Sequence, residues 1–280
     1  MTIQMNGKIA IVTGAGGTLC SEMARNLAQQ GAKVALIGRN LEKLKKVEQE
    51  ITKNGGAAIS VSADVTDQSQ VEAARMTIIN TFGFCDILIN GAGGNQPDAV
   101  TTISEFNDEE LNQEKGIRGF FNLSMEKFSN VIETNTMGTV IPCFVFGKDM
   151  AEKKSGVIIN IASMNSFRPL SRVGAYGMAK AGIMNFTQWL AAYLAPANIR
   201  VNAIAPGFFL NERSTKLLTT PDGGFTERGG NIIRQTPLKR FGKASELIGC
   251  INWLIDDEAA GFVTGITIPV DGGFLADSGI

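Results

Sequence analysis

The chain alternates short, β-branched apolar runs with longer amphipathic stretches. Runs of this kind, bounded by glycine or polar turn residues, predict strands, and the longer stretches between them predict helices. The predicted strands cover residues 8–13, 33–37, 57–63, 86–90, 156–161, 199–205 and 265–270. A helix between successive strands favours a parallel sheet, because a parallel connection needs a crossover.

The predicted strands are apolar on both sides, as is typical of a sheet that helices cover on both faces. With right-handed crossovers this pattern predicts an α/β fold, a doubly wound parallel sheet of seven strands in a three-layer sandwich. We expect one domain over residues 1–280, because no linker interrupts the pattern. Two segments exceed ordinary loop length, an insert at about residues 94–122 and a candidate substrate lid at about residues 207–242.

Composition excludes several classes of protein. With 280 residues, 44% of them hydrophobic, the chain can bury a large core. The formal net charge of −1 and the absence of a basic run give no reason to expect a nucleic acid or an anionic membrane as partner. No apolar segment approaches the ~20 residues that span a bilayer, and no leader pattern precedes the first strand, so we expect a cytoplasmic protein.

The chain contains four cysteines, far apart in the sequence, and no histidine. Zinc sites, disulfide frameworks and histidine-based triads are therefore poorly supported, and we expect no metal. Any acid or base in this chain must be another side chain.

The first predicted strand runs into a glycine-rich segment, residues 13–20, and then into a helix expected from about Ser21 to Gly31. Glycines let the backbone approach a pyrophosphate closely, and a helix N-terminus presents free N–H groups to it. The unit therefore predicts dinucleotide binding. A tight turn without a ligand is the alternative that these residues alone leave open.

Tyr176 and Lys180 lie one helical turn apart, so a phenol and an ammonium share a helix face. A free tyrosine titrates near pH ~10, and a fixed cation beside it favours the phenolate. The pair is therefore a candidate acid and base. Taken alone, Lys180 could equally be a solvated helix residue.

In order and spacing these motifs resemble the short-chain dehydrogenase/reductase family over essentially the whole chain. The family's nucleotide loop aligns with residues 13–20, its adenine-side aspartate with Asp64 and its Asn-Asn-Ala-Gly element with residues 90–93. Residues 200–207 and 270–273 complete the match. The resemblance implies a Rossmann-type fold and a catalytic set of Asn135, Ser163, Tyr176 and Lys180.

The same resemblance assigns a cofactor-binding set. Its members are Gly14, Gly16, Gly17, Thr18, Leu19, Arg39, Asn40, Asp64, Val65, Asn90, Ala92, Gly93, Tyr176, Lys180, Pro206, Gly207 and Phe209. Two departures from the family pattern bear on the cofactor's geometry. Thr18 and Cys20 replace loop glycines, and Asn211 replaces a threonine that would contact the nicotinamide amide.

The residue at the end of the second predicted strand indicates which cofactor is preferred, because an acidic residue there would bind the ribose diol of NAD. This chain has Gly38 there, followed by Arg39 and Asn40. Because a guanidinium suits a 2′-phosphate, we prefer NADP(H), with NAD(H) possible. Arg39 could instead stack on the adenine or extend into water.

The resemblance also implies roles for the catalytic set. Tyr176 would transfer the proton to or from the substrate oxygen, and Ser163 would hydrogen-bond that oxygen. Lys180 would lower the phenol pKa and bind the nicotinamide ribose. Asn135 would connect Lys180 to solvent through a water.

Within the family the chain most resembles the branch that interconverts D-fructuronate and D-mannonate, on the basis of residues 91–97, the insert, residues 163–167 and residues 205–210. A sugar acid needs a cation for its carboxylate and several polar groups for its hydroxyls. We predict that Asn95, Asn165 and Arg172 bind the substrate. The other basic candidates are Arg118, Arg168, Arg213 and Arg228, and for any one arginine a surface salt bridge is the competing interpretation.

Other functions stay open at this point. The same scaffold could serve another polyol or keto-acid reductase, such as a gluconate 5-dehydrogenase-like enzyme, or more distantly a 3-oxoacyl-carrier-protein reductase. A nucleotide-sensing protein without catalysis is a third possibility. Family resemblance implies a homotetramer, with a homodimer possible, and the helix expected over residues 173–194 offers Phe186, Trp189, Leu190, Tyr193 and Leu194 either to a partner or to the core.

Overall fold

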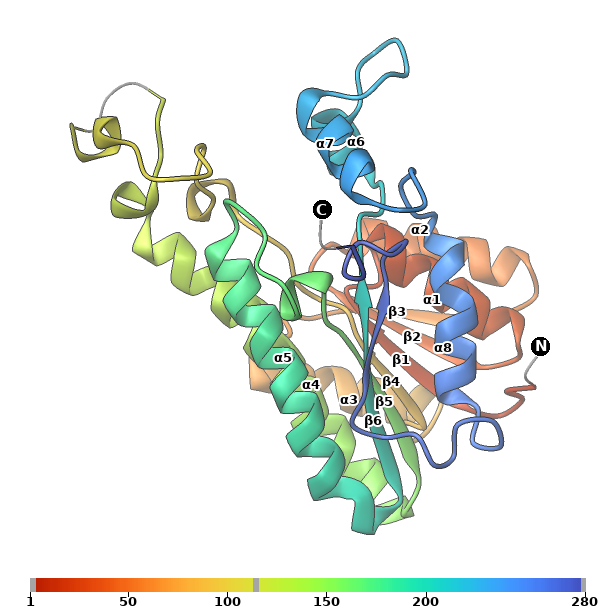
Figure 1. Cartoon of the computed structure of the whole chain (residues 1–280). Coiled ribbons are helices and arrows are strands. Elements are labelled where there is room, and N and C mark those ends of the chain that lie inside the picture. The colour runs from red at the N-terminus through yellow and green to blue at the C-terminus, as the bar shows by residue number, and fades with distance from the viewer. Residues whose placement is uncertain (1–3, 113–115, 278–280) are drawn as a thin grey trace.

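The computed structural model describes residues 4–112 and 116–277, with the side chains of residues 212 and 213 excepted. Seven strands form one parallel sheet in the order β3-β2-β1-β4-β5-β6-β7 (Figure 1). The strands are β1 (Ile9–Thr13), β2 (Lys33–Gly38), β3 (Ala57–Ser62), β4 (Ile87–Asn90), β5 (Gly156–Ile161), β6 (Ile199–Pro206) and β7 (Thr267–Val270). Every predicted strand is present, and the bounds differ by at most two residues.

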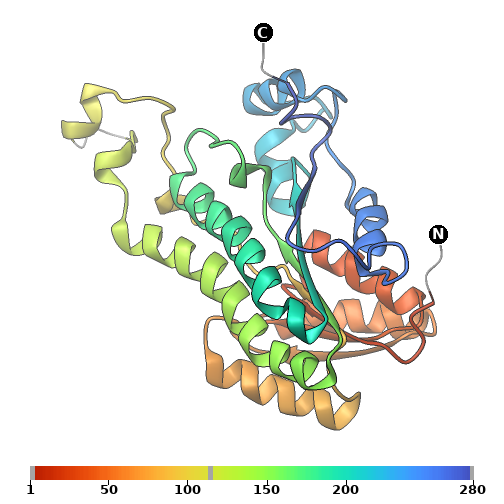
Figure 2. The ribbon, with the colours of Figure 1, turned by 60° about the horizontal axis from the view of Figure 1, so that its bottom comes forward.

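Helices cover both faces of the sheet (Figures 1 and 2). On one face, α1, α2 and α8 bury residues such as Leu27, Leu44 and Ile251 against the strands. On the other, α3, α4 and α5 bury residues such as Ile78 and Phe146. The predicted doubly wound, three-layer α/β fold is therefore confirmed. The helices are α1 (Thr18–Gln29), α2 (Leu41–Lys53), α3 (Gln68–Thr81), α4 (Met125–Lys153), α5 (Gly174–Leu194), α6 (Glu212–Leu218), α7 (Glu227–Gln235) and α8 (Ile248–Ile255).

The strand order reverses between β1 and β4, where the chain leaves one side of the sheet for the other. In open parallel sheets, ligands bind beyond the carboxyl ends of the strands at such a switch point. The glycine-rich segment after β1 and the segment after β4 meet there, because the Thr13 hydroxyl accepts hydrogen bonds from Gly91 N at 3.1 Å and Ala92 N at 3.3 Å.

Two long segments extend beyond the same end of the sheet (Figure 1). The insert contains three short 3-10 helices, η1 (Pro97–Ala99), η2 (Asp108–Asn112) and η3 (Phe120–Asn122), which the sequence pattern did not predict. The predicted lid segment carries α6 and α7. Both segments therefore lie at the end of the sheet where the carboxyl ends of the strands meet (Figure 1).

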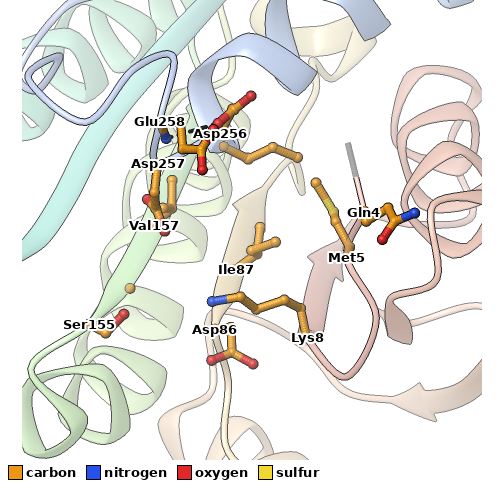
Figure 3. A pocket seen from close by; sticks show the side chains of 12 residues that line it. Gln4, Met5, Lys8, Asp86, Ile87, Ser155, Val157, Asp256, Asp257 and Glu258 are labelled. Carbon is orange, nitrogen blue, oxygen red and sulfur yellow. Dashed lines mark hydrogen bonds between the residues drawn. The ribbon is translucent and has the colours of Figure 1, made fainter. Parts of the chain in front are cut away.

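A cavity of about 410 Å³ lies at the opposite, amino-terminal end of the strands. Figure 3 shows Lys8, Asp86, Asp257 and Glu258 among the side chains that line it. None of the predicted site residues lies there. Within the described residues no cluster of histidine, cysteine or carboxylate side chains could hold a metal, and no helix is long and apolar enough to cross a membrane.

Candidate active site

The nucleotide loop ends in a helix that begins earlier than predicted. Helix α1 starts at Thr18 rather than near Ser21, and its N-cap residue Gly17 is extended, with φ −88° and ψ 156°. No side chain caps this helix, so its first-turn N–H groups are left for a ligand. Gly14 has a φ of 65°, and a Cβ there would come within 2.7 Å of Gly91 O. The turn therefore requires glycine at position 14.

A cleft of about 500 Å³ opens over this loop at the switch point. Eleven of the predicted cofactor residues line it: Gly14, Gly16, Gly17, Thr18, Leu19, Arg39, Asn40, Asp64, Val65, Ala92 and Gly93. Uncapped N–H groups at one end and polar side chains at the other fit a dinucleotide, whose pyrophosphate binds at a helix N-terminus. These residues would hold the phosphates and the adenine ribose.

The remaining predicted cofactor residues lie outside the lining of this cleft. Asn90 is 1% exposed and turned into the core, where its Nδ2 donates to Asn160 Oδ1 at 2.9 Å. Pro206 is the last residue of β6, Gly207 and Phe209 follow it, and Phe209 packs against the core. Tyr176 and Lys180 belong to the catalytic group described below.

Several residues of the cleft were missed in the sequence, among them Lys43, Leu44, Thr134 and Ile161. Lys43 and Leu44 lie in the first turn of α2, which Asn40 caps by accepting a hydrogen bond from Lys43 N at 2.9 Å. The signal for this start of a helix was present, because an asparagine immediately precedes the amphipathic run.

Cys20 and Gly91 form a complementary pair in this cleft. Cys20 stands where the family has a loop glycine, and Gly91 stands where it has the second asparagine of its Asn-Asn-Ala-Gly element. A Cβ at position 91 would lie 2.1 Å from Cys20 Sγ. The larger residue at one position therefore requires the smaller at the other. Burial raises the pKa of Cys20 to about 12, so its side chain remains a thiol.

Ser163, Tyr176 and Lys180 converge beside the cleft from two elements. Ser163 follows the carboxyl end of β5, and its Oγ accepts a hydrogen bond from Asn165 N at 3.2 Å. Tyr176 lies in the first turn of α5 and shares a side-chain hydrogen bond with Ser163. Lys180, one turn later, has its Nζ 5.6 Å from the centre of the Tyr176 ring. The structure thus brings together three of the four predicted catalytic side chains around one phenol.

The electrostatics of the phenol differ from the sequence-based expectation. Burial raises the pKa of Tyr176, and its hydrogen bond with Ser163 opposes that shift. The Lys180 ammonium lies over the Tyr176 ring and donates to Ile161 O at 2.7 Å. Burial also lowers the pKa of Lys180 to about 8. The phenol is therefore held in its protonated form.

Asn135 fixes the backbone next to Lys180. Its Oδ1 accepts from Gly94 N at 3.1 Å, and its Nδ2 donates to Gly94 O at 2.8 Å and to Val131 O at 2.7 Å. A Cβ at Gly93 would lie 2.4 Å from Asn135 Oδ1 and 3.6 Å from Lys180 Nζ. Asn135 and Lys180 therefore border the same glycine, although the side-chain hydrogen bonds of Asn135 are directed to the backbone.

Arg39 lies at the adenine end of the cleft, and its guanidinium is 3.7 Å from the carboxylate of Asp64. The Arg39 side chain is 73% exposed, so it can reach a ligand at the edge of the cleft. Its pairing with a carboxylate is an alternative to the two roles considered from the sequence, phosphate binding and adenine stacking.

The predicted substrate residues lie in different surroundings. Asn95 begins the insert, and its Oδ1 accepts from Gln96 N at 3.0 Å. Arg172 lies in the turn before α5. Asn165 is 4% exposed, its Oδ1 accepts from Leu170 N at 2.8 Å, and it lines a separate cavity of about 250 Å³ on the flank of α5. The structure therefore ties Asn165 to the loop that carries Arg172 rather than to the dinucleotide cleft.

Comparison with known proteins gives the family. Residues 8–221 match the model of the short chain dehydrogenase family, and the chain belongs to this family of oxidoreductases, which use NAD(H) or NADP(H). It is 48% identical over 274 residues to the uncharacterized oxidoreductase UxuB of Bacillus subtilis, covering 98% of this chain and 97% of that protein. It is 32% identical to the 2-dehydro-3-deoxy-D-gluconate 5-dehydrogenase of Escherichia coli, with 97% of each chain covered.

The fold has a close counterpart among solved structures. A Haemophilus influenzae protein crystallised with bound NAD, provisionally described as a D-mannonate oxidoreductase, superimposes with a TM-score of 0.94 at 43% sequence identity, over 99% of this chain and 98% of that one. The predicted relationship to the short-chain dehydrogenases and the Rossmann-type fold are thereby confirmed.

Proposed function

We propose that this chain is a nicotinamide-dependent oxidoreductase that interconverts D-fructuronate and D-mannonate. The observation that carries the proposal is the convergence of Ser163, Tyr176 and Lys180 beside a cleft that fits a dinucleotide. The sugar-acid substrate is supported by two similar proteins, the Haemophilus influenzae protein and the Escherichia coli gluconate-type dehydrogenase.

In the direction of reduction, Tyr176 donates its phenolic proton to the carbonyl oxygen of the substrate. A partly buried tyrosine with a raised pKa is protonated at neutral pH, so it can donate this proton. Ser163 hydrogen-bonds the same oxygen and holds it beside the phenol. The dinucleotide, when bound, supplies the hydride to the carbonyl carbon.

Lys180 and Asn135 organise the surroundings of the phenol. Because Lys180 donates one of its protons to Ile161 O, its ammonium is fixed between the end of β5 and the cleft, with further donors for a ribose hydroxyl. Asn135 holds the backbone of Gly94 in place beside it. We assign Lys180 to ribose binding, and we assign Asn135 to support of the segment that follows β4.

The preference for NADP(H) or NAD(H) rests on Arg39. The largely exposed Arg39 guanidinium could turn from Asp64 to a 2′-phosphate, which supports NADP(H). The Asp64 carboxylate and the NAD found in the Haemophilus influenzae structure favour NAD(H). We propose that both dinucleotides bind, and that the Arg39 side chain determines the ratio of the affinity for NADP(H) to the affinity for NAD(H).

The apolar surface of α4 and α5 supports a homo-oligomer. Phe144, Trp189 and Tyr193 are exposed, and the rings of Trp189 and Tyr193 stack with centroids 5.2 Å apart. Phe186 and Leu194 are partly buried against the core, and Leu190 is 8% exposed. The large apolar side chains of α5 therefore lie partly in the core and partly on the surface. A homotetramer or homodimer and a cytoplasmic location stay predictions.

The test is a spectrophotometric screen of the purified protein with D-fructuronate, tagaturonate and 5-ketogluconate, each with NADH and with NADPH. The proposal expects the fastest oxidation of the reduced cofactor with D-fructuronate. Fastest turnover of 5-ketogluconate would instead support the gluconate 5-dehydrogenase-like alternative. Binding of the dinucleotide without turnover of any keto acid would support a nucleotide-sensing protein.

A further inference from the structure

Two hydrogen bonds join the segment that carries Ser163 to helix α5, and both involve Lys180. On the amino-terminal side of Ser163, Ile161 O accepts from Lys180 Nζ at 2.7 Å. On the carboxyl-terminal side, Ser166 Oγ donates to Lys180 O at 2.7 Å. Ser163 therefore lies between two anchors that connect its segment to one residue of α5.

Ser166 is the member of this arrangement to which the sequence assigned no role. It is 7% exposed and ends the short 3-10 helix η4 (Met164–Ser166), whose N-cap is Ser163. Its backbone N–H donates to Ser163 O at 2.8 Å, and its hydroxyl donates to Lys180 O. Because a serine hydroxyl has a single proton to donate, that proton is committed to α5. One residue thus connects the backbones of two predicted catalytic residues.

Asn165 adds a packing contact about one turn earlier in α5. A Cβ at Gly177, the residue after Tyr176, would lie 3.4 Å from Asn165 Oδ1 and 3.6 Å from its Cγ. Asn165 Oδ1 also accepts from Leu170 N at 2.8 Å, and its buried Nδ2 has no hydrogen-bond partner among the described residues. The segment after β5 is therefore held against α5 both beside Tyr176 and at Lys180.

We propose that Ser166 is a positioning residue that sets the distance between the Ser163 hydroxyl and the Tyr176 phenol, an inference that rests on the role of Ser163 in the function proposed above. Ser163 follows β5 and Tyr176 belongs to α5, yet both must contact one substrate oxygen. A displacement of about 1 Å in such a pair can lower a rate by up to about 10²-fold. The bond from Ser166 to Lys180 O fixes the end of the segment that the Lys180 ammonium does not reach.

The position of Ser166 separates this role from a direct contact with the cofactor. Ser166 does not line the dinucleotide cleft. It lines the cavity of about 250 Å³ on the flank of α5. This cavity has room for one more methyl group, so Ser166→Thr keeps the hydroxyl, whereas Ser166→Ala removes it.

The test is a double-mutant cycle of Ser166→Ala and Ser163→Ala, measured with the keto acid that the wild type reduces fastest. Ser166→Ala should lower kcat about tenfold, while the KM for the keto acid and the dissociation constant of NADH stay near the wild-type values. In a chain that already carries Ser163→Ala, the same change should alter kcat by less than about twofold, because Ser166 acts through Ser163. Ser166→Thr should keep most of the wild-type kcat, and Ser166→Cys, with its weaker donor, should lie between the two.

Ser21→Ala is the matched control. Ser21 is 6% exposed, and its hydroxyl donates to a backbone carbonyl, Thr18 O at 3.2 Å, within helix α1. It does not line the dinucleotide cleft. This variant loses the same group from a similar depth without disconnecting two elements, so it should retain the wild-type kcat. Thermal melts of all variants check that each is folded.

The outcomes separate this inference from the proposed function. Wild-type kcat in Ser166→Ala, or an equal loss of kcat in both backgrounds, would reject the positioning role and leave the proposed function intact. Wild-type turnover in Ser163→Ala would overturn the role of Ser163, and the positioning role would fail with it. A wild type that reduces no keto acid would overturn both the proposed function and the inference drawn from it.

Discussion

On the dinucleotide side of the candidate active site, the functional groups come from strand ends and from the first turns of helices. On the substrate side the candidate groups come from the turn before α5, the insert and the lid. Thr13, Gly91 and Asn135 are tied to neighbouring backbone by short hydrogen bonds, whereas the Nη groups of Arg172 and the whole side chain of Arg228 have no partner in the described chain.

This difference assigns different tasks to the two sides. The buried side fixes the distance between a dinucleotide and a phenol, which the chemistry needs to be constant. The side built from long segments can change its polar groups without disturbing the sheet, so it sets the choice of substrate. Substitutions on the dinucleotide side should therefore lower the turnover rate for every substrate. Substitutions on the substrate side should change which substrate is preferred.

The largest effect is expected from Tyr176→Phe, which removes the proton donor and keeps the ring. The turnover number should fall about 10²-fold or more for every substrate, while the dissociation constant of the dinucleotide stays nearly constant. Stopped-flow turnover and fluorescence titration with NADH measure the two quantities. Wild-type turnover in this variant would end the assignment of Tyr176 as the acid.

The pH dependence of the two reaction directions tests the protonation state of the phenol. Because the pKa of Tyr176 is raised from its ordinary value of 10, the phenolate fraction increases about tenfold per pH unit between pH 7 and 9. The kcat/KM for alcohol oxidation, which needs a base, should rise with a slope near one over this range. Ketone reduction, which needs the acid, should stay nearly flat. A plateau of oxidation below pH 8 would show that Lys180 lowers the phenol pKa after all.

The next effect concerns the pair Cys20 and Gly91. Gly91→Asn restores the family's residue, but its Cβ would lie 2.1 Å from Cys20 Sγ. Overpacking of this kind costs about 1–3 kcal/mol. If the nucleotide loop shifts to make room for the side chain, this cost corresponds to a rise of roughly tenfold to hundredfold in the dissociation constant of the dinucleotide. The double variant with Cys20→Gly should recover the affinity. Cys20→Gly alone is the control, and equal weakening in the single and double variants would contradict the pairing.

The sequence predicted the sheet well because its central strands, β1, β4, β5 and β6, are buried throughout, which leaves a continuous apolar signal. It also predicted most of the lining of the cleft, since the spacing from Gly14 to Gly93 follows the strand ends. The start of α1 was predicted three residues late, because Gly17 caps this helix through backbone geometry without a side-chain signal.

Contacts between distant residues could not be predicted from the sequence. Nothing in the spacing of Tyr176 and Lys180 shows that Ile161 O binds the ammonium, nor that burial raises the phenol pKa. The periodicity of apolar residues indicates which residues are buried. It does not show which other residues they contact.

The smallest effect is expected from Arg39→Leu at the adenine end of the cleft. If the guanidinium leaves Asp64 for a 2′-phosphate, its loss removes one charge-assisted contact from NADPH and none from NADH. The KM for NADPH should then rise about tenfold, with the KM for NADH within twofold of the wild type. Arg25→Leu is the matched control, because Arg25 pairs with Glu50 at 2.7 Å and does not line the cleft. Equal changes in KM for both dinucleotides would indicate that Arg39 contacts the adenine, which NADH and NADPH share. Another residue on the dinucleotide side of the site would then have to determine the cofactor preference.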